Sequence, residues 1–224
     1  MSFVPTLDTD SPQRPRIPRA LEPAEIRILG SLMEKQLSTP EYYPLTLNAL
    51  VAACNQKSNR EPVMELSEAD VQRALDRLQD EKLAWRVMGG RAVRFDHNLD
   101  KVWHLKPAEK AIITMLFLRG PQTPGELRGR SDRLHRFETV AEVEDTLRDM
   151  AGHSEPLVRE LQRRPGQKES RWVHTAGGAV EEAVVETQAP AEAGTPLSAR
   201  VTRLEARVEE LHEQLRVLLQ KLGE

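Results

Sequence analysis

The sequence contains a single cysteine, Cys54, so it has no intramolecular disulfide framework and no metal or iron–sulfur site that needs several cysteines. Aromatic residues are scarce as well, at 4% of the 224 residues. A core with so few aromatic side chains must be built mainly from Leu, Val, Ile and Ala, which favours packed helices. These two absences indicate a mainly helical protein from a reducing compartment.

Long hydrophobic runs are absent too. No stretch approaches the roughly 20 apolar residues that cross a bilayer, and the first residues lack the apolar segment of a secretory signal. We therefore expect a cytoplasmic protein that does not contact a membrane. Neither sign of charge is in large excess, because 32 Lys and Arg face 35 Asp and Glu, for a net charge of −3. That balance argues against a protein that coats nucleic acid nonspecifically.

An internal repeat organises the middle of the chain. The segment 21–25 (LEPAE) recurs 84 residues later as 105–109 (LKPAE), and the pair Thr39-Pro40 recurs at the same offset as Thr123-Pro124. Apolar residues follow both prolines at helical spacing, and proline is favoured in a first helical turn. The sequence therefore predicts one amphipathic helix that is used twice.

Further along, the repeat continues at a shorter offset of 72, which relates Val71, Leu75 and Leu78 to Val143, Leu147 and Met150. Each copy then ends in two β-like runs around a turn, at 83–88 and 91–95 and again at 157–161 and 170–174. Three helices followed by a hairpin is the order of a winged-helix module, a variant of the helix-turn-helix. We predict an α+β fold, mainly α, with two tandem winged-helix modules at 21–97 and 98–175.

Two regions outside the modules have a composition unsuited to packing. Residues 1–20 contain four prolines with arginines between them, which predicts a disordered proline-rich arm. Residues 176–196 are rich in Ala, Glu, Gly and Pro, which predicts a flexible acidic linker before a final helix.

The drop in offset from 84 to 72 means that the first module holds 12 residues more than the second, between the Thr-Pro turn and the third helix. Because the shorter copy folds without them, this insertion is a candidate functional segment. Its polar run offers donors, acceptors and two cations for phosphate, sugar or protein contacts. The alternative is that these side chains cap neighbouring helices or are simply solvated. The candidate binding residues are Asn55, Gln56, Lys57, Ser58, Asn59 and Arg60.

Basic side chains in the second module form another candidate surface. They could line up along a phosphate backbone, or they could belong to an ordinary solvated surface with ion pairs. The third helices argue against deep insertion into a DNA groove, since 67–82 carries a net charge of −2 and 138–150 a net charge of −4. The candidate nucleic-acid or partner-binding residues here are Arg128, Arg130, Arg133, Arg163, Arg164, Lys168 and Arg171.

No pattern in the sequence is typical of catalysis. The six histidines stand apart without metal-ligand spacing, and no glycine-rich phosphate loop or nucleophile motif is present. Cys54 lies on the apolar face of a predicted helix, where a free cysteine acts as a small buried hydrophobe. We therefore expect no enzyme activity, no catalytic residues, no metal and no cofactor.

The C-terminal residues 197–224 carry a heptad pattern over almost four repeats. Valine at the first core position with leucine at the second favours a parallel two-stranded coiled coil, and hence a homodimer. The alternatives are a helix that folds back on its own modules and one that pairs with another protein. The predicted dimer contacts are Leu197, Val201, Leu204, Val208, Leu211, Leu215, Leu218 and Leu222.

Four segments resemble the YceH family, an uncharacterised family of bacterial proteins. They are 39–45 (TPEYYPL), 53–62 (ACNQKSNREP), 118–128 (LRGPQTPGELR) and 165–171 (PGQKESR). The resemblance runs from about residue 21 to the C-terminus. It implies a tandem winged-helix fold in bacteria, and it supplies no activity, cofactor or catalytic residue.

Two functions remain open. The first is a dimeric protein that associates with double-stranded DNA, as a transcriptional regulator does, holding phosphates with the arginines of the second module. The second is an adaptor or scaffold that uses the same modules to bind a protein partner, which the acidic third helices favour. Both rest partly on analogy of fold, which is a weak basis for function.

Overall fold

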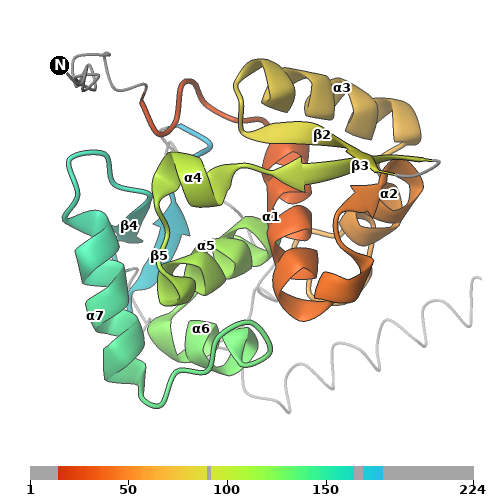
Figure 1. Ribbon diagram of the computed structural model, residues 1–224. Coiled ribbons are helices and arrows are strands. Elements are labelled where there is room, and N and C mark those ends of the chain that lie inside the picture. Colours follow the sequence, from red (N-terminus) through yellow and green to blue (C-terminus); the bar gives the residue numbers. More distant parts are fainter. Residues whose placement is uncertain (1–14, 90–91, 164–168, 179–224) are drawn as a thin grey trace, which may run out of the picture. The chain divides into compact units, whose positions relative to one another are not determined.

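Helices and short antiparallel strands alternate along residues 15–89, 92–163 and 169–178, which are the residues that the computed structural model describes (Figure 1). The fold class is α+β, as predicted, with more helix than strand. The helices are α1 (Pro23–Ser38), α2 (Leu47–Cys54), α3 (Glu68–Asp80), α4 (Leu99–Trp103), α5 (Pro107–Arg119), α6 (Pro124–Ser131) and α7 (Val140–Ala151), with the 3-10 turn η1 (Pro40–Tyr42). The strands are β1 (Leu45–Thr46), β2 (Ala84–Gly89), β3 (Ala92–His97), β4 (Val158–Leu161) and β5 (Arg171–His174).

Local sequence signals start most of the helices. Pro23 and Pro107 stand in the first turns of α1 and α5, and the Glu25 carboxylate accepts a hydrogen bond from the Glu22 amide at 2.7 Å. Ser67 caps α3 and forms a capping box with Asp70. Side-chain oxygens thus satisfy amides that would otherwise lack partners.

The order of elements repeats along the chain. In the first half, β1 precedes α2 and pairs with β3, which gives an antiparallel sheet of order β1-β3-β2. In the second half, Gln122 precedes α6 and bridges to Trp172 of β5, which pairs with β4. Sequence analysis did not foresee β1, α4 or η1. Gly89, predicted as a turn residue, is the last residue of β2 and pairs with Ala92.

The extra residues of the first half do not form one insertion. The equivalent capping residues of α2 and α6 are Thr46 and Thr123, which are 77 residues apart, whereas the caps of α3 and α7, Ser67 and Thr139, are 72 apart. Seven of the 12 extra residues therefore lie before α2, around η1, and five lie between α2 and α3. The Thr-Pro match is also inexact in structure, because Thr39 precedes η1 while Thr123 caps α6.

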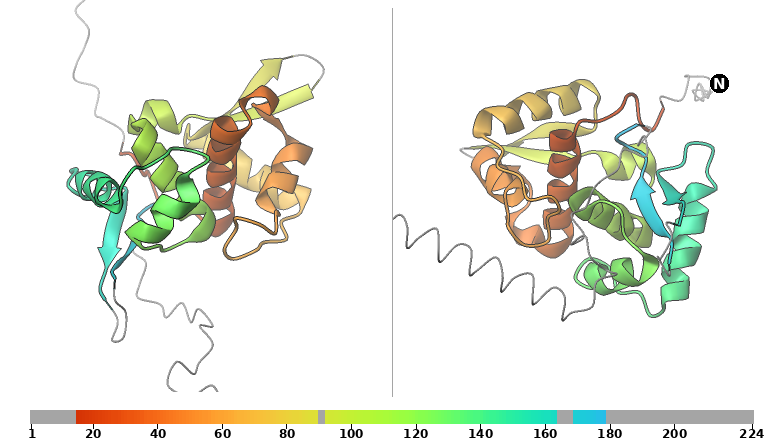
Figure 2. Two further views of the ribbon diagram at one scale, coloured as in Figure 1. Left: turned by 90° about the horizontal axis from the view of Figure 1, so that it is seen from below. Right: turned by 180° about the vertical axis from the view of Figure 1, so that it is seen from behind.

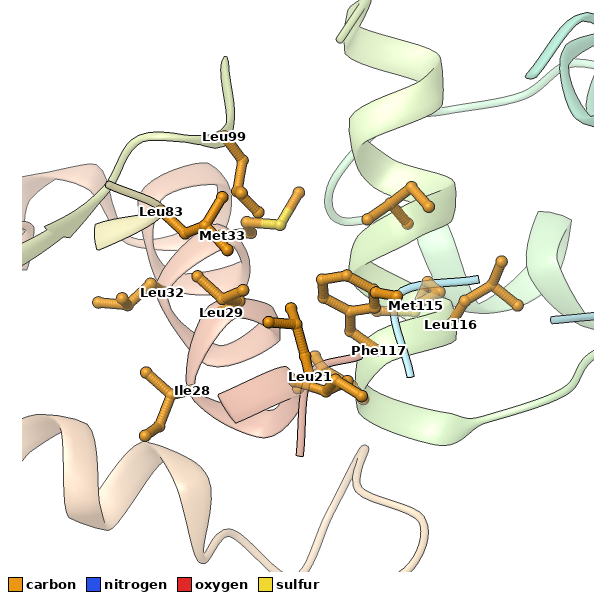
Figure 3. Close-up of a cluster of buried hydrophobic side chains, with 14 of the residues drawn as sticks. Leu21, Ile28, Leu29, Leu32, Met33, Leu83, Leu99, Met115, Leu116 and Phe117 are labelled. Carbon is orange, nitrogen blue, oxygen red and sulfur yellow. The ribbon is translucent and has the colours of Figure 1, made fainter. Parts of the chain in front are cut away.

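Helices α1 and α5 pack against each other at the centre of the described residues (Figure 2). Their side chains belong to one continuous cluster of buried apolar groups, in which Phe117 of α5 points towards Leu29 of α1 (Figure 3). The helices approach closely at Gly30, where a Cβ atom would lie 2.9 Å from Cβ of Phe117. All the described residues belong to one compact unit, residues 1–180.

Residues 15–20 lie against both halves of this unit. The indole of Trp103 donates a hydrogen bond to the Arg16 carbonyl at 2.6 Å, and the Arg16 amide donates to Glu155 at 2.8 Å. The rest of the predicted arm (1–14), the predicted linker from 179 to 196 and the predicted coiled coil (197–224) lie outside the described residues.

Candidate binding surfaces

The polar loop after α2 is held by hydrogen bonds within the chain. The Asn55 side chain exchanges two hydrogen bonds of 2.8 Å with the backbone of Leu66, and the Asn59 amide donates to Glu34 at 2.9 Å. Gln56 lies 3.5 Å from the Lys35 ammonium, whereas Lys57 and Ser58 are exposed. Most of the polar side chains of this loop therefore form hydrogen bonds within the protein. This agrees with the alternative in which they stabilise the fold and do not bind a ligand.

Arg60 is buried, with 4% of its surface exposed, although it was predicted as a binding residue. Its guanidinium donates to both carboxylate oxygens of Glu34, at 2.6 and 3.2 Å, and to the Ala53 carbonyl at 2.8 and 3.1 Å. Burial by itself would raise the pKa of Glu34, but hydrogen bonds and charge from Arg60 hold that pKa below its ordinary value. A guanidinium enclosed in this way is not accessible to a phosphate group. Arg60 is therefore not part of the exposed candidate surface.

A second arginine is buried beside this pair. Arg27 donates to the carbonyls of Cys54 and Pro62, at 3.1 and 2.6 Å, and its Nε has no hydrogen-bond partner among the described residues. Burial, followed by the charge of Arg60, lowers the pKa of Arg27. Burial also raises the pKa of the Cys54 thiol to about 11, which keeps the sulfur protonated and unreactive at neutral pH.

The arginines predicted in the second half divide into paired and unpaired groups. Arg128 donates to the carbonyls of Phe137 and Glu138, while Arg130 and Arg171 both form ion pairs with Glu126, at 3.2 and 2.8 Å. Arg128 and Arg171 hold α6 to its neighbours, whereas the pair of Arg130 with Glu126 lies within α6. In contrast, Arg133 and Arg163 are exposed and have no ion pair with a described residue. Arg164 and Lys168 lie outside the described residues.

The third helices present acidic surfaces with their cations already paired. On α3, Arg73 pairs with Asp70, and Arg77 reaches Glu22 and Glu25 at the start of α1, at 2.6 and 3.1 Å. On α7, Arg148 pairs with Glu144 and Asp145, and Asp149 is exposed beside them. A helix of this kind repels the phosphates of a DNA groove and attracts a basic partner.

A polar network that sequence analysis missed lies between the two halves. The His97 Nδ1 accepts from the Leu99 amide at 3.2 Å, so its Nε2 carries the proton and donates to Gln36 at 2.9 Å. The Lys110 ammonium also donates to Gln36 and to Asp100, the latter at 2.7 Å. The repeat relates Lys110 to the apolar Ile26, and this mismatch is the sequence signal that marks it.

The buried imidazole of His97 predicts a pH dependence. Burial, followed by the charge of Lys110, lowers the pKa of His97 from 6.5 to about 4, against the opposing charges of Asp100 and Asp96. The unfolded chain therefore binds a proton at His97 more tightly than the folded chain does. As the pH falls from about 6.5 to 4, this difference lowers the free energy of unfolding. In denaturant titrations, His97→Asn is expected to lose less stability over that interval than the unchanged protein. Equal losses in His97→Asn and in the unchanged protein would contradict the assignment, and His104→Asn, at an exposed site, is the control.

The described residues contain neither a membrane-spanning helix nor a metal cluster. None of their helices is both long and apolar enough to cross a membrane. Among the same residues, no three histidine, cysteine or acidic side chains gather in a way that would hold a metal ion.

Comparison with known proteins gives a family. Residues 21–167 match a family described as a protein of unknown function, DUF480, and the chain belongs to that family. The relatives it matches are UPF0502 proteins of bacteria. They include one from Azoarcus sp. (strain BH72), 47% identical over 93% of both chains, and one from Geobacter metallireducens, 50% identical over 84% of this chain and 88% of that protein.

The predicted YceH resemblance is confirmed by another relative. The UPF0502 protein YceH of Salmonella paratyphi A is 45% identical over 91% of this chain and 98% of its own length. None of these names describes an activity, so the function must be argued from the residues.

Proposed function

We propose that the chain is a binding protein without catalytic activity, built from two winged-helix modules at 21–97 and 98–175, that acts as an adaptor in the bacterial cytoplasm. The repeated order of three helices and a hairpin, with a strand or bridge before each second helix, supports this assignment of the modules. In such modules the third helix is the element that contacts the ligand.

The observation that carries the adaptor function is the charge of both third helices. The exposed faces of α3 and α7 contain acidic groups, and the arginines among them form ion pairs within the chain. Binding to DNA would bring these carboxylates against phosphates, at an unfavourable Coulomb energy. A protein with a basic surface would instead be attracted to them.

Charge reversal on α7 tests the adaptor function. Asp145→Lys with Asp149→Lys is expected to remove the proteins that cross-link to the full chain inside the bacterium, as measured by quantitative mass spectrometry. The matched control, Glu41→Lys with Asp132→Lys, makes the same change of charge at exposed sites outside the third helices and should keep those proteins. Retention of the same proteins by the α7 variant would rule out recognition by α7.

Association with double-stranded DNA is the second candidate function. Arg133 and Arg163, exposed and without ion pairs to described residues, favour it. Phosphate contacts predict that the logarithm of affinity falls linearly with the logarithm of salt concentration. Arg163→Ala with Arg164→Ala should then reduce that slope by about two. Binding too weak to measure even at low salt would eliminate this function.

We also propose that the C-terminal residues form the predicted coiled coil and make the protein a dimer. The full chain should sediment as a dimer, and Leu204→Lys with Leu211→Lys should convert it to a monomer because charges would enter the predicted seam. Glu210→Lys, at a predicted outward position, should leave the dimer intact. A dimer that persists in the leucine variants would refute assembly through this segment.

A further inference from the structure

Strand β2 forms one edge of the first sheet, whose order is β1-β3-β2 (Figure 1). It pairs with β3 along all six of its residues, Ala84–Gly89, and no other described strand pairs with it. A strand at the edge of a sheet presents backbone N–H and C=O groups that can pair with another chain. The register of β2 against β3 determines which of these groups point outwards.

Two residues of β2 have backbone groups that point away from β3. In an antiparallel pair, facing residues alternate between those that exchange two hydrogen bonds and those that exchange none. The His97 amide donates to the Tyr43 hydroxyl at 3.0 Å, so it does not bond to Ala84, which faces it in β2. By the same alternation, Arg86 and Met88 exchange no hydrogen bonds with β3. Their N–H and C=O groups point outwards, where no described residue forms a hydrogen bond with them.

The edge of the second hairpin carries more charge than the edge of the first. Strand β4 has Arg159 and Glu160 among its four residues, and charged side chains on an edge discourage pairing. In β2 the single charged residue is Arg86, and its guanidinium lies 3.2 Å from the Asp76 carboxylate of α3. The apolar side chain of Met88 is 85% exposed. The edge of β2 is therefore longer and more apolar than that of β4.

The two faces of β2 differ in what they offer to an added strand. The Arg86 side chain reaches α3, so Arg86 and Met88 lie on the face towards that acidic helix. Trp85 and Val87 lie on the opposite face and are partly exposed. An added strand would therefore find apolar side chains on both of its own faces.

A cation lies over the face of β2 opposite α3. The Lys101 ammonium stands 4.7 Å from the centre of the Trp85 ring and forms no ion pair with a described residue. Side chains that face each other on neighbouring strands lie within contact distance. An acidic side chain opposite Trp85 would thus complement the charge of Lys101, and it would point away from the carboxylates of α3.

We propose that β2 takes up an extended segment of the adaptor's partner as an added strand, in which apolar residues surround one Asp or Glu opposite Trp85. Main-chain hydrogen bonds to Arg86 and Met88 hold this segment, and its side chains select it. The inference rests on the adaptor function, because it names the form in which the partner binds. A second copy fits less well, because it would bring two acidic α3 helices to the same face of a joint sheet.

Amide hydrogen exchange of the full chain, resolved by residue with NMR, tests the edge. In the free protein we expect the Trp85 and Val87 amides, which bond to β3, to exchange more slowly than those of Arg86 and Met88. Protection of the latter two amides that grows with protein concentration would identify a second copy as the occupant and overturn the proposal.

A capped synthetic peptide, Val-Val-Thr-Glu-Val, is the probe for the partner segment. Antiparallel to β2, it places valine opposite Met88 and glutamate opposite Trp85. We expect a Kd below about 1 mM and slower exchange of the Arg86 and Met88 amides. A peptide with lysine for glutamate should bind at least about threefold more weakly, and a fully N-methylated form, which lacks backbone donors, should not bind measurably. If the glutamate peptide does not bind, or if all three bind equally, the proposal is overturned.

A proline variant tests the backbone contact. Met88→Pro removes an outward donor and leaves the ladder to β3 intact, and it should weaken binding of the glutamate peptide at least about fivefold. Glu160→Pro is the matched control. The Trp172 amide and carbonyl bond to Gln122, so the facing Glu160 also points outwards in β4, and peptide affinity should be unchanged. Equal weakening by the two prolines would contradict docking on β2.

A charge variant tests the selection of the acidic residue. Lys101→Gln should weaken binding of the glutamate peptide about threefold, whereas Lys57→Gln, at an exposed site in the loop after α2, should leave it unchanged. Equal affinities of these two variants would refute the contact with Lys101. The peptide measurements use purified protein, so their failure is distinct from failure of the adaptor function, which the charge reversal on α7 tests inside the bacterium.

Discussion

Replacing Glu34 with alanine is expected to lower the free energy of unfolding by about 3–5 kcal/mol, because it leaves the Arg60 guanidinium buried without its anion. The Arg60 side chain is fully buried and that of Glu34 is 10% exposed, so water does not replace the lost carboxylate. The neighbouring Arg27 forms no ion pair with a described acidic residue, so the variant also leaves two buried cations to repel each other.

Denaturant titration measures this loss, with Glu61→Ala as the control. Glu61 is half exposed and lies 3.5 Å from Arg119, so its removal should cost less than about 1 kcal/mol. The pH dependence gives a separate check. The pKa of Glu34 is lower in the folded protein than in the unfolded chain. The ionised carboxylate therefore contributes to the free energy of unfolding above the pKa of the unfolded chain, and this contribution is lost as the pH falls through the pKa of the folded protein. Similar losses in the two alanine variants would show that the buried pair does not determine stability.

Replacing Gly30 with valine should destabilise the protein by about 3 kcal/mol, because the new side chain has no room between α1 and α5. The first carbon alone would lie 2.9 Å from Cβ of Phe117 and 3.0 Å from Cδ2 of Leu118. Both helices are buried around this point, so neither can move outwards without opening the shared core. Glycine and valine are both weak helix formers, so the difference is mainly steric.

Gly129→Val is the matched control for this substitution. Gly129 also lies inside a helix, but an added Cβ there meets nothing within 4 Å, so the change should shift stability by less than about 1 kcal/mol. Combining Gly30→Val with Leu118→Ala should cost less than the sum of the two single changes, because the smaller side chain makes room for the valine. Strict additivity would show that the two residues do not compete for space.

Features encoded by short-range signals could be predicted from the sequence. The prolines at 23 and 107 stand in the first turns of their helices, as the repeat predicted. The period of the apolar residues placed the third helix of each half within a few residues. Such signals depend on neighbours within one helical turn, so no tertiary information is needed to interpret them.

The role of the polar loop could not be predicted in the same way. A run of donors and cations looks similar whether its partners are in a ligand or in the protein. The partner of Arg60 and Asn59 is Glu34, which lies 25 residues or more away on α1, and only the folded chain brings it close. The sequence therefore correctly marked a segment with unusual chemistry, but it could not show that this chemistry is directed inwards.

The complete burial of α1 and α5 could also not be predicted from the spacing of their apolar residues. Helical spacing predicted an amphipathic helix with one face in a core, whereas residues 25–34 and 109–118 are buried on all sides. The second face of each helix is covered by the other helix. Charged residues such as Glu25 and Lys110 gave these helices a solvent-facing appearance, yet they form ion pairs and hydrogen bonds within the unit.

The close contact of α1 with α5 at Gly30 has a consequence for recognition. Since the two halves share one hydrophobic core, their acidic third helices, α3 and α7, stay at a constant separation. They cannot reorient relative to each other when a partner binds. A molecule that touches both gives up its freedom of tumbling only once, so its second contact adds avidity at little extra entropic cost. The same rigidity disfavours any molecule whose two contact points do not match the spacing of α3 and α7. The contact between α1 and α5 would therefore select partners by the distance between their contact points.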